Sequence, residues 1–183
     1  MHEDITTKKG VRSENIVSKI AQEIKGYARS HHYSYNNFKQ IIHIVDIDGA
    51  YLDQDKIHED TFSKKLRYSE EGIYTSNVKG IVARNTVKKD NIFRLESKSI
   101  IWNIPYRVYY MSSNLDHVLY NKLNSSDNEK ENDAYAFAKK YKNDVNGFVK
   151  YMCDSDFSVK GNYRDSWAFL KSQTRSIVRC SNL

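Results

Sequence analysis

A short apolar run that ends in acidic residues constrains this chain more than any other feature of its sequence. Residues 41–45 read Ile-Ile-His-Ile-Val and are followed directly by Asp46-Ile47-Asp48-Gly49. A brief, β-branched and nearly continuous apolar segment is typical of a strand covered on both faces, as in a parallel sheet. In open α/β sheets, ligands bind at the carboxyl ends of such strands. We therefore expect an α/β fold with a functional edge at Asp46 and Asp48.

Helical periodicity flanks this strand on both sides. Residues 1–12 are polar and are expected to fray, and Ser13 is a candidate N-cap for a helix whose isoleucines recur at helical spacing. Residues 53–82 are polar and mixed, which indicates an insertion. A further helix is expected over residues 84–98. Its pattern places three apolar side chains inward and three basic side chains outward, namely Val87, Ile92 and Leu95 against Lys88, Lys89 and Arg94.

The second half of the chain predicts one more strand and then helices. The strand is expected over residues 106–111, after a turn around Pro105, and a Ser-Ser-Asn turn then caps a short helix from Leu115. Apolar residues at spacings of three and four predict one helix from Ala134 to Met152, and a last helix begins near Tyr163.

These elements together predict a single α/β domain over residues 1–183. We expect a small parallel sheet flanked by helices within residues 13–123, with the insertion at about 53–82, and a helical C-terminal layer over residues 124–183.

Composition bounds the classes of partner. The formal net charge is +6 and the pI about 9.1, which favours contact with nucleic acid, although Lys-rich composition also gives solvated surfaces that have no partner. The two cysteines, Cys153 and Cys180, form no metal or disulfide motif. The sequence lacks a membrane-spanning apolar run and a secretory signal at its start, so we expect a cytoplasmic protein without membrane contact.

The acidic pair is the candidate catalytic and metal site. Two carboxylates one residue apart at a strand end can converge on one Mg²⁺ or Mn²⁺ ion, which binds phosphate oxygens as well. Asp46 and Asp48 are therefore expected to serve phosphodiester chemistry. Arg84 and Lys88 are candidate contacts for the nucleic-acid backbone. His43, inside the apolar run, is expected to be a packed core histidine.

Two segments together resemble the TOPRIM-like RloB family, which is regarded as a family of metal-dependent nucleases. They are IIHIVDIDG, residues 41–49, and YRVYYMSSNLDHVLYNKL, residues 106–123. The resemblance implies a nuclease in bacterial phage defence by abortive infection, with an ATPase partner protein. It assigns Asp116 to the acidic position of the site and Asn114 to the turn that meets nucleic acid. One departure is that the family's upstream glutamate, at the end of an earlier strand, has no counterpart before residue 40.

Two other readings of the sequence stay open. The segment VDIDGAYL also looks like the first motif of haloacid-dehalogenase-type phosphatases, in which Asp46 would be the nucleophile and Asp48 the acid/base. That class needs a second acidic pair at a strand end, and Asp154 and Asp156 follow a predicted helix. The other reading is a non-catalytic protein that binds nucleic acid or protein, with inhibition of a phage-defence complex as one form of such binding. An oligomer is compatible with all of these functions.

Overall fold

The structure is a computed structural model that describes residues 4–62, 65–172 and 175–183. The described part of the chain is mixed α/β, as expected, with two short 3₁₀ turns at Tyr35–Asn37 and Gln54–Lys56. Its helices and strands follow in the order α1 (Ile16–Ser30), β1 (Ile41–Asp46), β2 (Ile57–Glu59), β3 (Arg67–Tyr68), β4 (Ile73–Thr75), α2 (Val78–Glu96), β5 (Ile100–Ile101), β6 (Ile104–Met111), α3 (Leu115–Tyr120), α4 (Asp127–Tyr141), α5 (Val145–Asp154) and α6 (Tyr163–Leu170).

The chain divides into two compact units, and neither of them is continuous in sequence. The first unit combines Met1–Val45 with Ala83–Tyr109, and the second combines Asp46–Val82 with Tyr110–Leu183. The chain therefore passes from one unit to the other three times, after residues 45, 82 and 109.

The strands form two small mixed sheets, where one parallel sheet was expected. The first has the order β1-β6-β5, and β5 pairs antiparallel with β6 in the register Ile101↔Ile104. The second has the order β2-β4-β3, with β2 parallel and β3 antiparallel to β4. This second sheet lies wholly within the predicted insertion, residues 53–82, so the polar segment has its own hydrogen-bonded structure.

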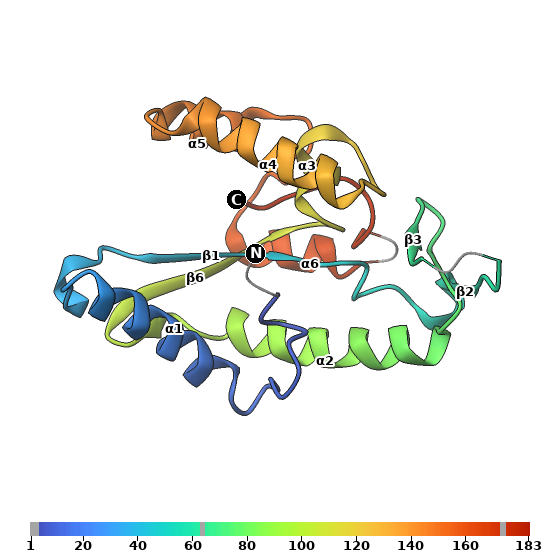
Figure 1. Ribbon diagram of the computed structural model, residues 1–183, viewed down its shortest axis with the longest axis horizontal. Helices are drawn as coiled ribbons and strands as arrows, with labels where there is room; N and C mark the ends of the chain where they lie inside the picture. Colours follow the sequence, from blue (N-terminus) through green and yellow to red (C-terminus); the bar gives the residue numbers. More distant parts are fainter. Residues whose placement is uncertain (1–3, 63–64, 173–174) are drawn as a thin grey trace. The chain divides into compact units, whose positions relative to one another are not determined.

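Within the first unit, α1 and α2 both lie on one face of β1 and β6 (Figure 1). Side chains of β6 accordingly alternate, because Tyr106 and Val108 are buried whereas Arg107 is exposed. The strand β1 confirms the predicted segment, but the expectation that both its faces are covered is wrong. Ile42 and Ile44 are 57% and 43% exposed, because the helices of this unit cover only the opposite face.

The N-terminal segment is ordered against α2, and this corrects two predictions. Residues 4–11 were expected to fray, yet Thr6 and Val11 are buried. Lys88 was expected to face outward, yet its side chain is fully buried and its Nζ lies 2.7 Å from Oδ2 of Asp4. Asn91 adds a second link, because its Nδ2 donates to the Thr6 carbonyl at 2.8 Å. A counter-charge brought by the N-terminal segment makes burial of Lys88 tolerable.

The start of α2 and the turn before β6 both differ from the sequence pattern. The helix α2 begins at Val78, six residues before its predicted start. The turn expected around Pro105 lies instead at Trp102 and Asn103, which both have positive φ, 50° and 61°. Two consecutive left-handed residues make the tight hairpin that suits the twist of paired strands, and Pro105 then belongs to β6.

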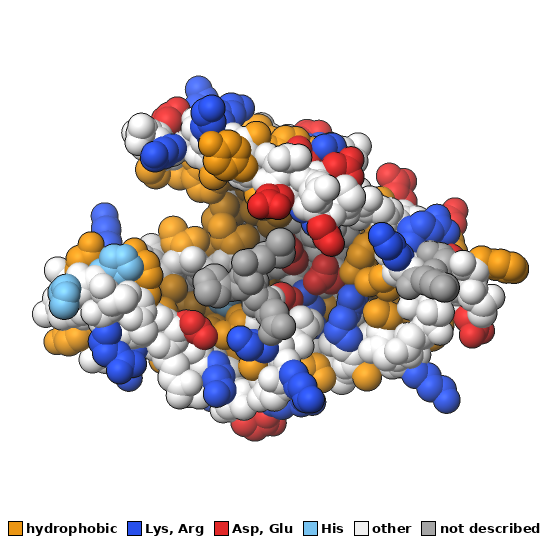
Figure 2. Space-filling view, in the orientation of Figure 1, with side chains coloured by type: hydrophobic (Ala, Val, Ile, Leu, Met, Phe, Trp, Pro, Cys, Tyr) orange, Lys and Arg blue, Asp and Glu red, His pale blue; other side chains and the backbone are white. Residues whose placement is uncertain are grey.

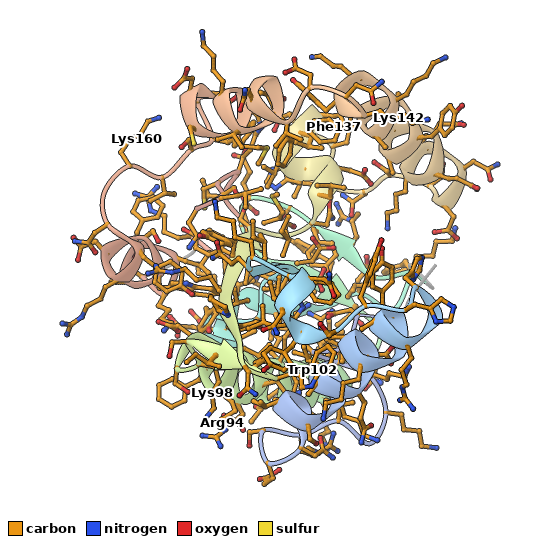
Figure 3. The ribbon with its side chains drawn as sticks, turned by 90° about the vertical axis from the view of Figure 1, so that its left-hand side faces the viewer. Arg94, Lys98, Trp102, Phe137, Lys142 and Lys160 are labelled. Carbon is orange, nitrogen blue, oxygen red and sulfur yellow. The ribbon has the colours of Figure 1, made fainter. Side chains whose placement is uncertain are left out.

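Helices form the C-terminal part of the second unit, as predicted, but with one more break than expected. The predicted helix from Ala134 to Met152 is two helices, because Asp144 caps α5 by accepting a hydrogen bond from the Gly147 N–H at 2.8 Å. Phe137, on α4 (Figure 3), packs with α5 against a core cluster of Met111, Val118, Leu119, Met152 and Phe157. Among the described residues, no helix has both the length and the apolar character needed to cross a membrane.

Candidate functional site

The candidate site lies in the second unit, where β1 and β6 end. Backbone bonds join the two chain segments beyond the strands. The Ile47 N–H donates to the Met111 carbonyl at 2.9 Å, and the Asp48 N–H donates to the Ser113 carbonyl at 2.8 Å. The bonded residues advance in the same direction along both segments, as in a parallel pair. The acidic pair and the Ser-Asn turn, which are 65 residues apart between Asp48 and Ser113, are thus direct neighbours.

A tight backbone turn holds the acidic pair. Asp48 and Gly49 have φ values of 51° and 67°, and the Ala50 N–H donates back to the Ile47 carbonyl at 2.9 Å. A side chain at Gly49 has no room, because an added Cβ would lie 2.9 Å from Cδ1 of Ile73. Asp48 is a non-glycine residue in the left-handed region, a conformation that costs energy and that aspartate adopts more readily than most other residues.

Burial alternates along this turn. Val45 and Ile47 are buried, whereas Asp46 and Asp48 are half-exposed, so both aspartates lie on the more open side of this segment. Oxygen donors that solvent can reach suit Mg²⁺, which binds through one or two carboxylates and keeps several waters. The pair therefore fits an open divalent-metal site. Among the described residues, no group of three acidic, histidine or cysteine side chains could enclose a metal ion.

The C-terminal segment supports the turn that follows β6, and no local sequence pattern predicted this support. The Ser112 N–H donates to the Cys180 carbonyl, and the Cys180 N–H donates to the Ser112 hydroxyl, at 2.9 and 2.8 Å. The Ser113 N–H donates to the Ser176 carbonyl at 3.0 Å. The hydroxyls of Ser113 and Ser176 are buried without a hydrogen-bond partner among the described residues. Ser113 also accepts the Asp48 N–H through its carbonyl, so these two buried hydroxyls belong to residues of the same backbone network and could each bind a water or a ligand.

Asp116 lies in the same unit but is coupled to α4. Burial raises the pKa of its carboxyl above the ordinary value, and the strongest charges acting on it are Lys130, Asp133 and Lys122. The described residues contain no three-membered metal cluster, so the structure does not assemble Asp116 with Asp46 and Asp48 into one. Asn114, the predicted nucleic-acid contact, is the N-cap of α3, and its Oδ1 accepts from the His117 N–H at 2.9 Å.

The two predicted basic contacts belong to the first unit. The guanidinium of Arg84 donates to Oδ1 of its neighbour Asn85 at 2.7 and 3.0 Å. Lys88 is buried on Asp4, as described above, so its ammonium is inside the unit rather than on the surface where a phosphate would be met.

A phosphatase of the haloacid-dehalogenase type would need a second acidic pair, for which the sequence offers Asp154 and Asp156. Asp154 is the last residue of α5, and the Asp156 carboxylate accepts from Nη1 of Arg179 at 2.7 and 2.9 Å. Asp154 thus ends a helix and Asp156 follows it, so neither residue lies at the end of a strand.

Comparisons with known proteins add nothing to these observations, since no family model, curated protein or solved structure matches the chain.

Proposed function

We propose that this protein is a divalent-metal-dependent nuclease with a TOPRIM-like site, in which Asp46 and Asp48 hold Mg²⁺ or Mn²⁺. The observation that carries the proposal is the position of this pair, half-exposed on a strained turn at the end of β1 and bonded to the end of β6. In the family that the sequence resembles, the same two strand ends carry the acidic motif and the Ser-Asn turn.

The chain's own residues have distinct tasks in this proposal. The two carboxylates hold the ion, and the buried Ile47 between them anchors the turn. A bound ion of this kind polarises phosphate oxygens and lowers the pKa of water. The Ser113 hydroxyl, which has no partner among the described residues, is available to donate to a ligand of the site. Asp116, a catalytic candidate by resemblance, has a positioning role through α3 in this proposal, because its strongest charge partners lie on and before α4.

The substrate and setting follow from charge and from the resemblance. A net charge of +6 suits a polyanionic substrate, DNA or RNA. Phage defence in the cytoplasm, by abortive infection and with an ATPase partner or an oligomeric assembly, is the setting that the RloB-like resemblance implies.

Thermal melting with and without millimolar Mg²⁺ or Mn²⁺ tests the metal site first. A ligand that binds only the folded state raises the melting temperature, by about 3–5 °C when its concentration is about ten times its dissociation constant. The rise is expected in the wild type and not in Asp46→Asn/Asp48→Asn. The control is Asp53→Asn/Asp55→Asn, because those aspartates have the same spacing but are both exposed. An equal rise in all three proteins, or no rise in the wild type, contradicts the proposal.

Hydrolysis is tested on plasmid DNA, single-stranded DNA and RNA in the presence of Mn²⁺. Cleavage should fall at least about 100-fold in Asp46→Ala, because loss of a metal ligand removes the charge stabilisation on which the reaction depends. The Asp53→Ala variant should cleave as the wild type does. Turnover of p-nitrophenyl phosphate without cleavage of nucleic acid would instead favour the phosphatase reading of the same pair.

A non-catalytic binding protein is the second candidate function. The observation that favours it is that the described residues offer no third acidic or histidine group beside Asp46 and Asp48. Such a protein binds its nucleic-acid or protein partner equally well with and without divalent metal.

A further inference from the structure

The first unit carries a connected series of aromatic rings on its surface. It starts in the last turn of α1, where the rings of Tyr27 and His31 stack with centroids 4.2 Å apart and planes 29° apart. His31 and Tyr33 continue the stack at 5.7 Å and 21°. Edge and tilted contacts then lead to the β5–β6 hairpin, because Trp102 lies 6.3–6.4 Å from two rings of the α1–β1 loop (Figure 3). We call this series the aromatic ridge, and its members are Tyr27, His31, Tyr33, Tyr35, Phe38 and Trp102.

The ridge is open to solvent to an extent that folding does not explain. Tyr27, Tyr33 and Tyr35 are 55%, 46% and 41% exposed. Aromatic rings normally stabilise a fold by being covered, so a contiguous exposed group of them marks a surface that binds something.

The two segments that supply the ridge are basic, and acidic residues such as Glu23 and Glu96 stand just outside them in sequence. Residues 24–45 and 97–115, which supply all six rings, contain no Asp or Glu. They include Lys25, whose Nζ lies 5.9 Å from the centre of the Trp102 ring, and also Arg29, Lys39 and Lys98. In the space-filling view, hydrophobic, histidine and basic side chains gather at the left-hand end without a red one among them (Figure 2). Positive charge interleaved with exposed rings selects a partner that is both aromatic and anionic.

We propose that the aromatic ridge binds single-stranded nucleic acid, with unpaired bases stacking on its rings and phosphates meeting its lysines. Base–aromatic stacking tolerates any sequence, because every base has a π-face, and the flanking cations follow the backbone. A duplex hides its base faces within the helix, so the ridge discriminates against double strands. This binding is independent of the metal chemistry proposed above, since none of its residues belongs to the acidic pair.

Fluorescence anisotropy with a labelled oligothymidylate of about 15 nucleotides tests the inference, at a length that spans one single-strand site. EDTA is included so that no metal-dependent cleavage can occur. The wild type should bind this strand and the corresponding oligouridylate more tightly than a duplex of the same length. Tyr27→Ala/Tyr33→Ala should weaken binding at least about tenfold, because each ring removed deletes a stacking platform. Tyr27→Phe/Tyr33→Phe should restore it, since the rings remain.

The controls separate the ridge from exposed tyrosine and charge in general. Tyr135→Ala, on α4 in the other unit, removes a tyrosine that is 69% exposed and should leave the affinity unchanged. Lys25→Gln/Lys39→Gln should reduce the slope of log affinity against log salt by about 1 to 1.5, as the loss of two phosphate contacts on a single strand requires.

Three outcomes overturn the inference. They are a wild type that does not bind the single strands at low salt, equal binding of duplex and single strand, and unchanged affinity in Tyr27→Ala/Tyr33→Ala. Binding in EDTA that depends on the ridge, together with no cleavage in Mn²⁺, would contradict the nuclease proposal and leave this inference standing.

Discussion

Nζ of Lys88, a side chain without any solvent exposure, lies 2.7 Å from Oδ2 of Asp4, 84 residues away in the sequence. Asp4 is further held by Thr6, whose hydroxyl donates to both of its carboxylate oxygens. Burial by itself raises the pKa of Asp4, but the charge of Lys88 and the hydrogen bonds from Lys88 and Thr6 outweigh it, so the pKa of Asp4 lies below its ordinary value.

Removing the carboxylate should cost more than removing the ammonium. Asp4→Asn leaves a fully buried ammonium opposite a neutral amide, and the free energy of unfolding should fall by about 3 kcal/mol, as for a broken buried pair. Lys88→Met fills the same space with an apolar side chain and leaves Asp4 about one-third exposed, so its cost should be smaller. Urea unfolding of the three proteins at pH 7 measures both. A larger loss of unfolding free energy in Lys88→Met than in Asp4→Asn would contradict this prediction.

The same pair predicts a pH dependence. Because the folded-state pKa of Asp4 is lowered, its contribution is complete above the unfolded value of about 3.9 and is lost as the pH falls through the folded value. The stability difference between the wild type and Asp4→Asn should therefore be constant from pH 7 to pH 5 and shrink below pH 4. A difference that is already shrinking at pH 6 would point to another titrating group.

His43 should govern stability at mildly acidic pH. Burial lowers its pKa to about 4, although the charge of Asp4 acts in the opposite direction, and its Nδ1 lies 2.8 Å from the Tyr106 hydroxyl. The unfolded chain binds a proton at this residue below about pH 6.5, whereas the folded chain does not until about pH 4. Stability therefore falls by about 2 kcal/mol between those values.

Unfolding of His43→Gln at pH 7 and pH 4.5 checks this expectation. The variant should lose less stability than the wild type over that interval, whereas His32→Gln, which changes an exposed histidine, should follow the wild type. Equal pH dependence in wild type and His43→Gln would show that the loss of stability between pH 7 and pH 4.5 does not come from burial of the His43 imidazole.

Gly49→Ala should destabilise the turn of the acidic pair. Its φ of 67° disfavours a side chain, and the new Cβ would lie 2.9 Å from Ile73 and 3.0 Å from Ile177. We expect a loss of about 2–4 kcal/mol from strain and overpacking together. Gly10→Ala is the matched control, because φ is 80° there but the space is open, and backbone strain of about 1–2 kcal/mol is the whole cost. Similar losses at the two sites would show that the packing against Ile73 can relax.

Asp116→Asn should stabilise the protein at pH 7, by about 1 kcal/mol, because burial disfavours the charged carboxyl and raises its pKa. The gain should vanish as the pH falls and the wild-type carboxyl becomes protonated. Thermal melting at pH 7 and pH 4 measures it. If Asp116→Asn instead abolished stabilisation by Mn²⁺, then Asp116 would be a metal ligand.

Local pattern was sufficient for the strand and the acidic turn, because those features depend on neighbouring residues. The apolar run at residues 41–45 forms β1 as predicted, whereas the alternation of buried and more open residues, which continues through Ile47 and leaves both aspartates on the open side, differs from the predicted cover on both faces. The break between α4 and α5 also had a local signal, since Asp144 stands three residues before the Gly147 N–H that it caps. Apolar periodicity runs through that cap, and reading periodicity alone merged the two helices.

The parts that could not be predicted depend on residues distant in sequence. A helical wheel places Lys88 on a polar face, because it contains no information about Asp4, which pairs with Lys88 in the folded unit. Likewise, the Ser113 N–H donates to the Ser176 carbonyl. This is a bond between backbone groups, and the pattern of side chains along the sequence carries no information about it. The orphan hydroxyls of the candidate site arise from such contacts, so they too were invisible in the sequence.

The interleaved order of the two units has a consequence for how the chain is made. During synthesis the first 45 residues emerge without α2 and β6, which complete their unit only after residue 109 has been added. The partners of Asp4 and Thr6, which are Lys88 and Asn91, are synthesised more than 80 residues later. A nascent chain that ends before that point lacks β6, the partner strand of β1, so the first unit can form as a whole only after residue 109 has been added.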